Sequence, residues 1–142
     1  MYRLILILMT KNNHYLTVST LSFFLLFFVF CCSSAPDKVG NLDLVKWRSD
    51  RGGCGDVRKG LEKEFVKIQS ELLGKHIDDV GYMLGRPDIQ QLGSRDQKFY
   101  VYFVEKGIHC TDITQKSAAQ KVILRFNAVG LLSEITFQAR PL

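Results

Sequence analysis

A nearly unbroken apolar run close to the N-terminus, Leu21–Phe30 (LSFFLLFFVF), decides how much of this chain is left to fold. The basic residues Arg3 and Lys11 precede it, and small residues follow it. This order is typical of a secretory signal. A buried core helix explains the run poorly, because a terminal segment that is apolar on all sides would need partners all around it. We therefore expect export, with residues 1–32 as a leader and the folded part after it.

The residues after the run are compatible with three endings of the leader, and the sequence leaves all three open. Cys32 fits the position at which a lipoprotein receives its lipid, and fits better than Cys31, so we predict lipidation of Cys32. Ordinary cleavage after Ala35 would place Pro36 in an extended protease site, where its ring and missing N–H fit badly. An uncleaved anchor would use Tyr15–Cys32, at the short end of the roughly 17–25 residues that span a bilayer.

The part that follows the leader, about 110 residues, is long enough for one small domain. The full chain has a net charge of +5, and Arg3 and Lys11 are the only charged residues of the leader, so the remainder carries +3. Its basic residues form no patch, which argues against a nucleic-acid partner. Residues 33–45 (SSAPDKVGNLDLV) are polar with proline and glycine, so we expect a tether there and a domain over 46–142.

Cys54 and Cys110 are the two cysteines of the folded part, and in an exported chain such a pair predicts a disulfide. The bond would close a loop of about 55 residues and contribute roughly 3–4 kcal/mol. A metal site from Cys54, Cys110, His109 and His76 is the alternative, and it is disfavoured because no spacing among them is that of a chelating pair. A nucleophilic Cys110 helped by His109 is disfavoured because neighbours in sequence usually point apart. We predict no metal or cofactor site.

The apolar period of the domain changes from helical to alternating, which predicts helices first and strands afterwards. The fold class expected is α+β, with two helices followed by a three-stranded antiparallel meander (ααβββ) whose strands are covered on one face by the helices. The predicted helices are 57–73 and 77–84, and the predicted strands are 98–104, 121–126 and 131–138, the last two joined by a turn over 127–130.

Other residues have a structural explanation that is preferred to a catalytic one. Asp78 and Asp79 suit the start of a helix better than an acid/base pair. Trp47, the one tryptophan, is expected in the core, and Asp56 is expected to cap the first helix. The long polar loop 105–119 carries Cys110, and loops of this length are often functional. We find no catalytic constellation and expect little room for a deep pocket.

Short motifs along the chain resemble the BamE (SmpA/OmlA) lipoproteins and the wider β-lactamase-inhibitor-protein-like fold. The motifs are Leu72-Leu73-Gly74-Lys75, Asp79-Val80, Leu84-Gly85-x-Pro87-Asp88, Tyr100-x-Tyr102 and Leu124-x-Phe126-Asn127-x-x-Gly130-Leu131. The resemblance implies an ααβββ domain that binds protein rather than one that catalyses a reaction. In BamE this domain belongs to a periplasmic lipoprotein of the complex that inserts outer-membrane β-barrels.

Together these features predict a non-enzymatic envelope lipoprotein that acts as a protein-binding or structural module, with outer-membrane assembly as the setting that the resemblance implies. The alternative is an inhibitor or immunity-type protein that binds a periplasmic enzyme, and a small Cys-dependent hydrolase is a third reading. The expected partners are envelope proteins and, through the lipid, the membrane. We expect no nucleic acid, cofactor or small-molecule substrate. The expected location is the outer membrane, or the periplasm or exterior for a soluble product.

Overall fold

The computed structural model describes residues 34–112 and 114–142, and their compact unit runs from Ala35 to Leu142. The predicted leader and the predicted lipid site Cys32 lie outside the described residues. Among the helices that are described, none is both long enough and apolar enough to cross a bilayer.

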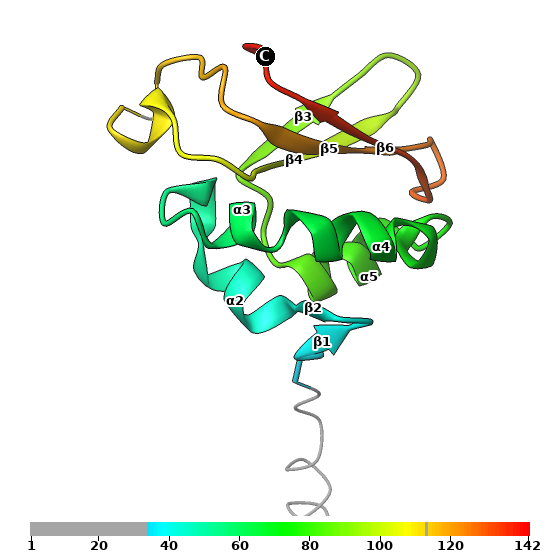
Figure 1. The fold of residues 1–142 in the computed structure, drawn as a ribbon. Helices are drawn as coiled ribbons and strands as arrows, with labels where there is room; N and C mark the ends of the chain where they lie inside the picture. The colour runs from blue at the N-terminus through cyan, green and yellow to red at the C-terminus, as the bar shows by residue number, and fades with distance from the viewer. Residues whose placement is uncertain (1–33, 113) are drawn as a thin grey trace, which may run out of the picture. The chain divides into compact units, whose positions relative to one another are not determined.

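The unit in Figure 1 contains short helices in its first half and strands mainly in its second. The helical elements are α2 (Leu44–Ser49), η1 (Arg51–Gly53), α3 (Val57–Gly60), α4 (Glu62–Leu72), α5 (Ile77–Leu84) and η2 (Ile108–Cys110). The strands are β1 (Lys38–Val39), β2 (Leu42–Asp43), β3 (Ile89–Leu92), β4 (Lys98–Phe103), β5 (Lys121–Phe126) and β6 (Leu132–Gln138).

The first folded segment is the β1–β2 hairpin, which leads directly into α2. The Asp43 side chain starts α2 by accepting a hydrogen bond from the Lys46 amide at 3.0 Å. Leu42 and Leu44 are fully buried. Residues 38–45 therefore belong to the folded unit and not to a tether. The two buried leucines hold this stretch against the core. The polar composition of the stretch, with its proline and glycine, did not indicate this packing.

The predicted helix 57–73 is divided into α3 and α4 at Leu61, which follows Gly60, a poor helix former. The apolar face that predicted it is nevertheless buried, through Phe65, Ile68 and Leu72. The predicted helix 77–84 matches the bounds of α5.

The start of α3 is capped by a different residue from the one expected. Asp56 adopts a left-handed conformation (φ 57°) and its side chain makes no capping hydrogen bond. The Asp50 carboxylate instead accepts hydrogen bonds from the amides of Gly55 (2.7 Å) and Arg58 (2.9 Å). Asp50 lies six residues earlier in the chain, and the bend at η1 brings it back to the helix.

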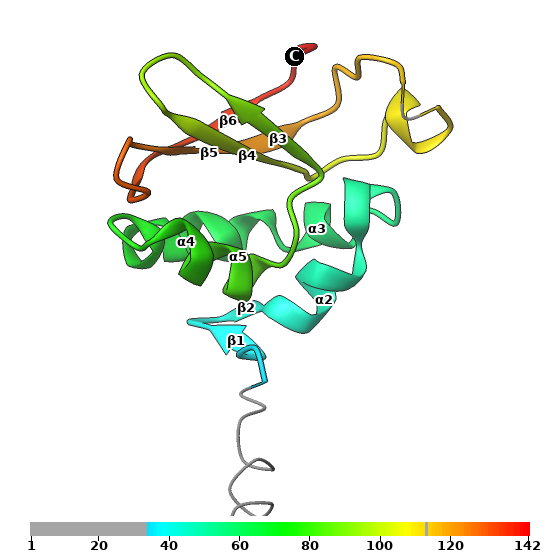
Figure 2. The same ribbon diagram turned by 180° about the vertical axis from the view of Figure 1, so that it is seen from behind.

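The main sheet has the antiparallel order β3-β4-β5-β6, and helices α3, α4 and α5 lie on one of its faces (Figures 1 and 2). Alternate residues of β4, β5 and β6 join the core beneath the sheet. These are Tyr100, Tyr102, Val122, Leu124, Phe126, Ile135 and Phe137.

The chain is α+β, but the predicted ααβββ arrangement is wrong. The described residues form four α-helices, a two-stranded sheet and a four-stranded sheet. The unexpected member of the main sheet is β3, a four-residue edge strand whose centre is Gln90-Gln91. Its turn to β4 uses Arg95 and Asp96, both with φ 58°, rather than the usual Asn-Gly. A short polar strand followed by such a turn carries neither the apolar pattern nor the turn signal of a hairpin.

Trp47 lies in the core, as expected, and is fully buried between the helices and the sheet. Its ring stacks on Phe65 at a centroid distance of 4.7 Å and lies 6.2 Å from the ring of Tyr102. Burial raises the pKa of the Tyr102 hydroxyl, which donates a hydrogen bond to the carbonyl of Gly85 at 2.8 Å. This aromatic cluster joins α2, α4 and β4.

Candidate functional site

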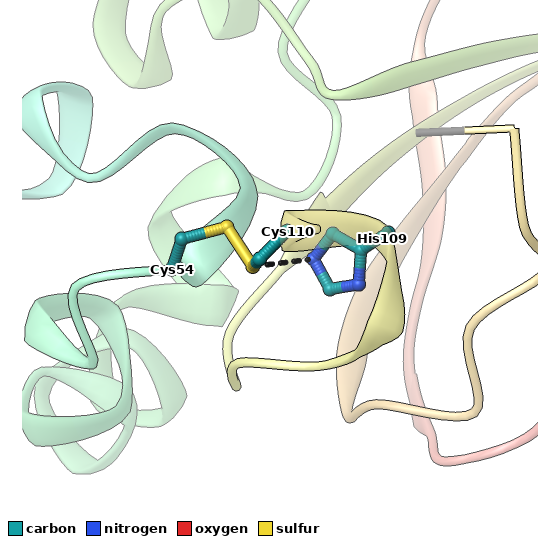
Figure 3. A group of neighbouring side chains, drawn as sticks. All are labelled: Cys54, His109 and Cys110. Carbon is teal, nitrogen blue, oxygen red and sulfur yellow. Dashed lines mark hydrogen bonds between the residues drawn. A yellow bond between two sulfur atoms is a disulfide. The ribbon is translucent and has the colours of Figure 1, made fainter. Parts of the chain in front are cut away.

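Cys54 and Cys110 form a disulfide in the structure, with their Cα atoms 5.7 Å apart (Figure 3). Cys54 follows η1, and Cys110 is the last residue of η2 in the long loop between β4 and β5. The bond therefore fastens this loop to the segment that begins α3. It gives the loop a defined position beside η1.

The side chains of His109 and Cys110 lie together, although we expected them to point apart. The His109 Nε2 is 3.5 Å from the Cys110 Sγ (Figure 3). Both residues belong to the 3-10 helix η2, where consecutive side chains are about 120° apart instead of nearly opposite as in a strand. Adjacency in sequence thus did not predict the relative direction of these two side chains, because that direction depends on the local backbone conformation.

His109 is held by two contacts and is only 6% exposed. Its ring stacks on Phe103 with centroids 3.7 Å apart, and its Nε2 lies 2.7 Å from the carbonyl oxygen of Gly52. A carbonyl only accepts hydrogen bonds, so we assign the proton of the neutral ring to Nε2. The Nδ1 atom is buried and has no hydrogen-bond partner among the described residues.

A buried ion pair behind the disulfide holds η1 in place. The Asp88 carboxylate lies 2.6 Å from the Arg58 guanidinium and also accepts hydrogen bonds from the amides of Gly52 (2.9 Å) and Phe103 (2.8 Å). Arg58 additionally donates to the carbonyls of Trp47 and Phe103. One carboxylate thus ties η1, α3 and β4 together. This pair could not be predicted from the sequence, because its members are 30 residues apart.

Lys121 is a further buried charged residue that could not be predicted from the sequence. Its amine donates hydrogen bonds to the carbonyls of Ser117 (3.1 Å) and Arg140 (2.6 Å), and it lies 5.3 Å from the centre of the Phe103 ring. Burial lowers the pKa of this amine. Lys121 joins the end of the loop and the C-terminal segment to the sheet.

The disulfide and its neighbours border a partly open cavity of about 640 Å³, which we call the disulfide pocket. Both half-cystines, Phe103 and His109 line it, together with Ile89 and the loop residues on either side of position 113. Its volume is within the roughly 300–1,000 Å³ range of ligand sites. The space beside the disulfide is larger than we expected, because the loop adds a wall that a sheet and its helices alone would not provide.

The disulfide pocket opens onto the side of the main sheet that faces away from the helices, which we call the outer face. Its residues alternate with those of the core, and strand register places them in rows. They are Ile89, Gln91, Phe99, Val101, Phe103, Lys121, Ile123, Arg125, Glu134, Thr136 and Gln138. The central row runs from Ile89 through Val101 and Ile123 to Thr136. The outer face is thus apolar along its middle and polar at its margin. Val101, Phe103 and Lys121 are already buried within the chain, so Ile89, Phe99 and Ile123 are the apolar residues of this face that remain half-buried.

The remaining candidate residues lie elsewhere. Asp78 and Asp79 are exposed in the first turn of α5, which agrees with a helix-start role. His76 caps the same helix, with its Nδ1 3.2 Å from the Asp78 carboxylate, and is not part of the group formed by Cys54, His109 and Cys110.

Comparison of the chain with protein-family models, with curated proteins and with solved structures gave no match.

Proposed function

We propose that this chain is a non-enzymatic binding module of the cell envelope, and that it binds a partner protein through the outer face and the adjoining disulfide pocket. The observation that carries the proposal is the one-sided covering of the sheet, since α3, α4 and α5 pack on one face only (Figure 2). A sheet face with an apolar centre and a polar margin has the character of a protein interface.

The described part of the chain favours binding over catalysis. Cys110, the candidate nucleophile of a Cys-dependent hydrolase, is bonded to Cys54 and carries no free thiol. Asp88 is committed to Arg58 and two amides, so it is not available as a base. The BamE-like motifs favour a partner in outer-membrane assembly, and an enzyme bound by an inhibitor or immunity-type protein is the alternative partner.

A photoreactive phenylalanine analogue placed at Ile123 is expected to form a covalent adduct of one defined mass with the partner in envelopes of cells that express the full chain. Ile123 is half-buried at the centre of the outer face, so a docked protein would contact it. Mass spectrometry of the adduct would identify the partner and distinguish an assembly protein from an enzyme.

The matched control is the same analogue at Val66, an apolar residue on α4 that is 51% exposed and lies in the helical layer. It is expected to give no adduct of that mass. Ile123→Glu should abolish co-purification of the crosslinked partner, whereas Val66→Glu should not. Equal adducts from both positions, or none from Ile123, would contradict the outer face as the binding surface.

We further propose that the module is attached to a membrane through lipid on Cys32. Mass spectrometry of the mature N-terminus is expected to find a diacylglyceryl-modified Cys32, because this cysteine follows the apolar run Leu21–Phe30 and fits the lipid position better than Cys31. A Cys32→Ser variant should lose the modification, while Cys31→Ser should keep it. A free N-terminus near Pro36 would contradict lipid attachment.

A further inference from the structure

Cys54, His109 and Cys110 bring three atoms that are good metal ligands into one small group. The two Sγ atoms and one ring nitrogen of His109 all lie within 4.8 Å of one another (Figure 3). Zinc bonds of about 2.3 Å to sulfur and about 2.0 Å to nitrogen, arranged tetrahedrally, place the two ligand atoms about 3.5 Å apart. The Nε2 of His109 and the Sγ of Cys110 are 3.5 Å apart. This pair already has the separation that one ion requires.

The disulfide excludes a metal ion, so such a site exists only after reduction. A small-molecule dithiol supplies two electrons and two protons: the bond between Cys54 and Cys110 breaks into two thiols, and the dithiol becomes a cyclic disulfide. Zn²⁺ then replaces the two thiol protons, which are released to solvent. The two sulfurs must move to about 3.8 Å apart for tetrahedral coordination. With Cα atoms 5.7 Å apart, we expect side-chain rotation to achieve this.

Recruiting His109 as a third ligand has two costs. Coordination through Nε2 moves the ring proton to Nδ1, which is buried and has no acceptor among the described residues, and it breaks the hydrogen bond to the Gly52 carbonyl. The bonds from zinc to the two thiolates and the imidazole must offset both. The Gly52 carbonyl oxygen lies 2.7 Å from Nε2 and 3.6 Å from the Cys54 Sγ. All three side chains line the disulfide pocket, so a water molecule from the pocket can take the fourth position.

We propose that the reduced chain binds one Zn²⁺ through Cys54, Cys110 and His109, so that the disulfide and the metal site are two alternative states of the same residues. The thiolates and imidazole are the donors that zinc prefers. Zinc therefore stabilises the reduced state, and it slows reoxidation to the disulfide because both sulfurs are bonded to the metal.

The test uses the full chain in detergent, in a Cys31→Ser/Cys32→Ser background that removes the two leader thiols. After anaerobic reduction and removal of the reductant, Co²⁺ is added as the probe. We expect one Co²⁺ per chain, with the d–d bands of tetrahedral cobalt and a sulfur-to-cobalt charge-transfer band. Stoichiometric Zn²⁺ should remove these bands, and the oxidised chain should show none.

His109→Gln is expected to abolish the tetrahedral bands, because glutamine keeps a donor near Gly52 but offers no imidazole. The matched control is His76→Gln, which removes a histidine outside the group and should leave the spectrum unchanged. Circular dichroism records whether the reduced chain stays folded. If it unfolds, the proposal requires one equivalent of Zn²⁺ to restore the fold. Failure of Zn²⁺ to refold it, absence of cobalt bands, or equal bands in His109→Gln would overturn the proposal.

Discussion

Replacing Asp88 with asparagine is expected to lower the free energy of unfolding, measured by urea titration, by about 3–5 kcal/mol. Arg58 is 1% exposed, and among the described residues its guanidinium pairs with the Asp88 carboxylate alone, at 2.6 Å. The neutral amide of the asparagine leaves the Arg58 guanidinium buried without a counter-charge. The NH₂ group of the asparagine would also face an N–H donor of Arg58, Gly52 or Phe103, so one hydrogen bond would be replaced by two donors in contact. Because Asp88 also holds the amide of Gly52, we expect η1 to loosen as well.

The exposed ion pair between Arg125 and Glu134 provides the matched control for Asp88. The two groups are 2.7 Å apart, with side chains 37% and 47% exposed. Glu134→Gln is expected to cost only about 0–1 kcal/mol, because water replaces most of what an exposed pair loses. Equal losses in Asp88→Asn and Glu134→Gln would contradict the role of burial.

Trp47→Ala is expected to lower the free energy of unfolding by about 3–5 kcal/mol. The indole is fully buried, stacks on Phe65 and lies beneath the Arg58 guanidinium at 5.1 Å from the ring centre. Alanine would leave a cavity where α2, α4 and β4 meet. Far-UV circular dichroism is the suitable measurement, because Trp47 is the single tryptophan and its loss removes the fluorescence signal.

Trp47→Phe separates packing from hydrogen bonding at this position. The indole Nε1 has no hydrogen-bond partner among the described residues, so phenylalanine sacrifices no bond and keeps an aromatic ring. We therefore expect a clearly smaller loss of stability than for Trp47→Ala. A loss as large as that of alanine would show that the cavity volume is not the source of the effect.

The elements that sequence analysis predicted well are those whose pattern is local. Strands β4, β5 and β6 lie within a residue or two of the predicted bounds, since alternation along each strand already separates core from outer face. The β1–β2 hairpin and β3 were missed because they are two to four residues long and partly polar. Such short strands form because they pair with a neighbouring strand, and a local sequence pattern does not show this pairing.

In the candidate site, too, the features with a local sequence signal could be predicted and those formed by tertiary contacts could not. The pairing of Cys54 with Cys110 is what the sequence predicts for two cysteines in a domain expected to be exported. The placement of His109 beside that bond could not be predicted, because it depends on the 3-10 turn of η2 and on the stacking against Phe103. In the sequence, Asp88 was noted only as the last residue of the motif Leu84-Gly85-x-Pro87-Asp88. Its role emerges from three donors that converge on it from η1, α3 and β4.

By itself the sequence determined the apolar N-terminal run, the alternation of the main strands, the helical apolar faces and the cysteine pair, because each of these depends on residue type and local spacing. The tertiary structure alone decided the four-stranded sheet, the buried Arg58–Asp88 pair and the pocket that surrounds the disulfide. These features require contacts between residues tens of positions apart. A contact of that kind is set by the packing of whole elements, and so it leaves no periodic trace in the chain.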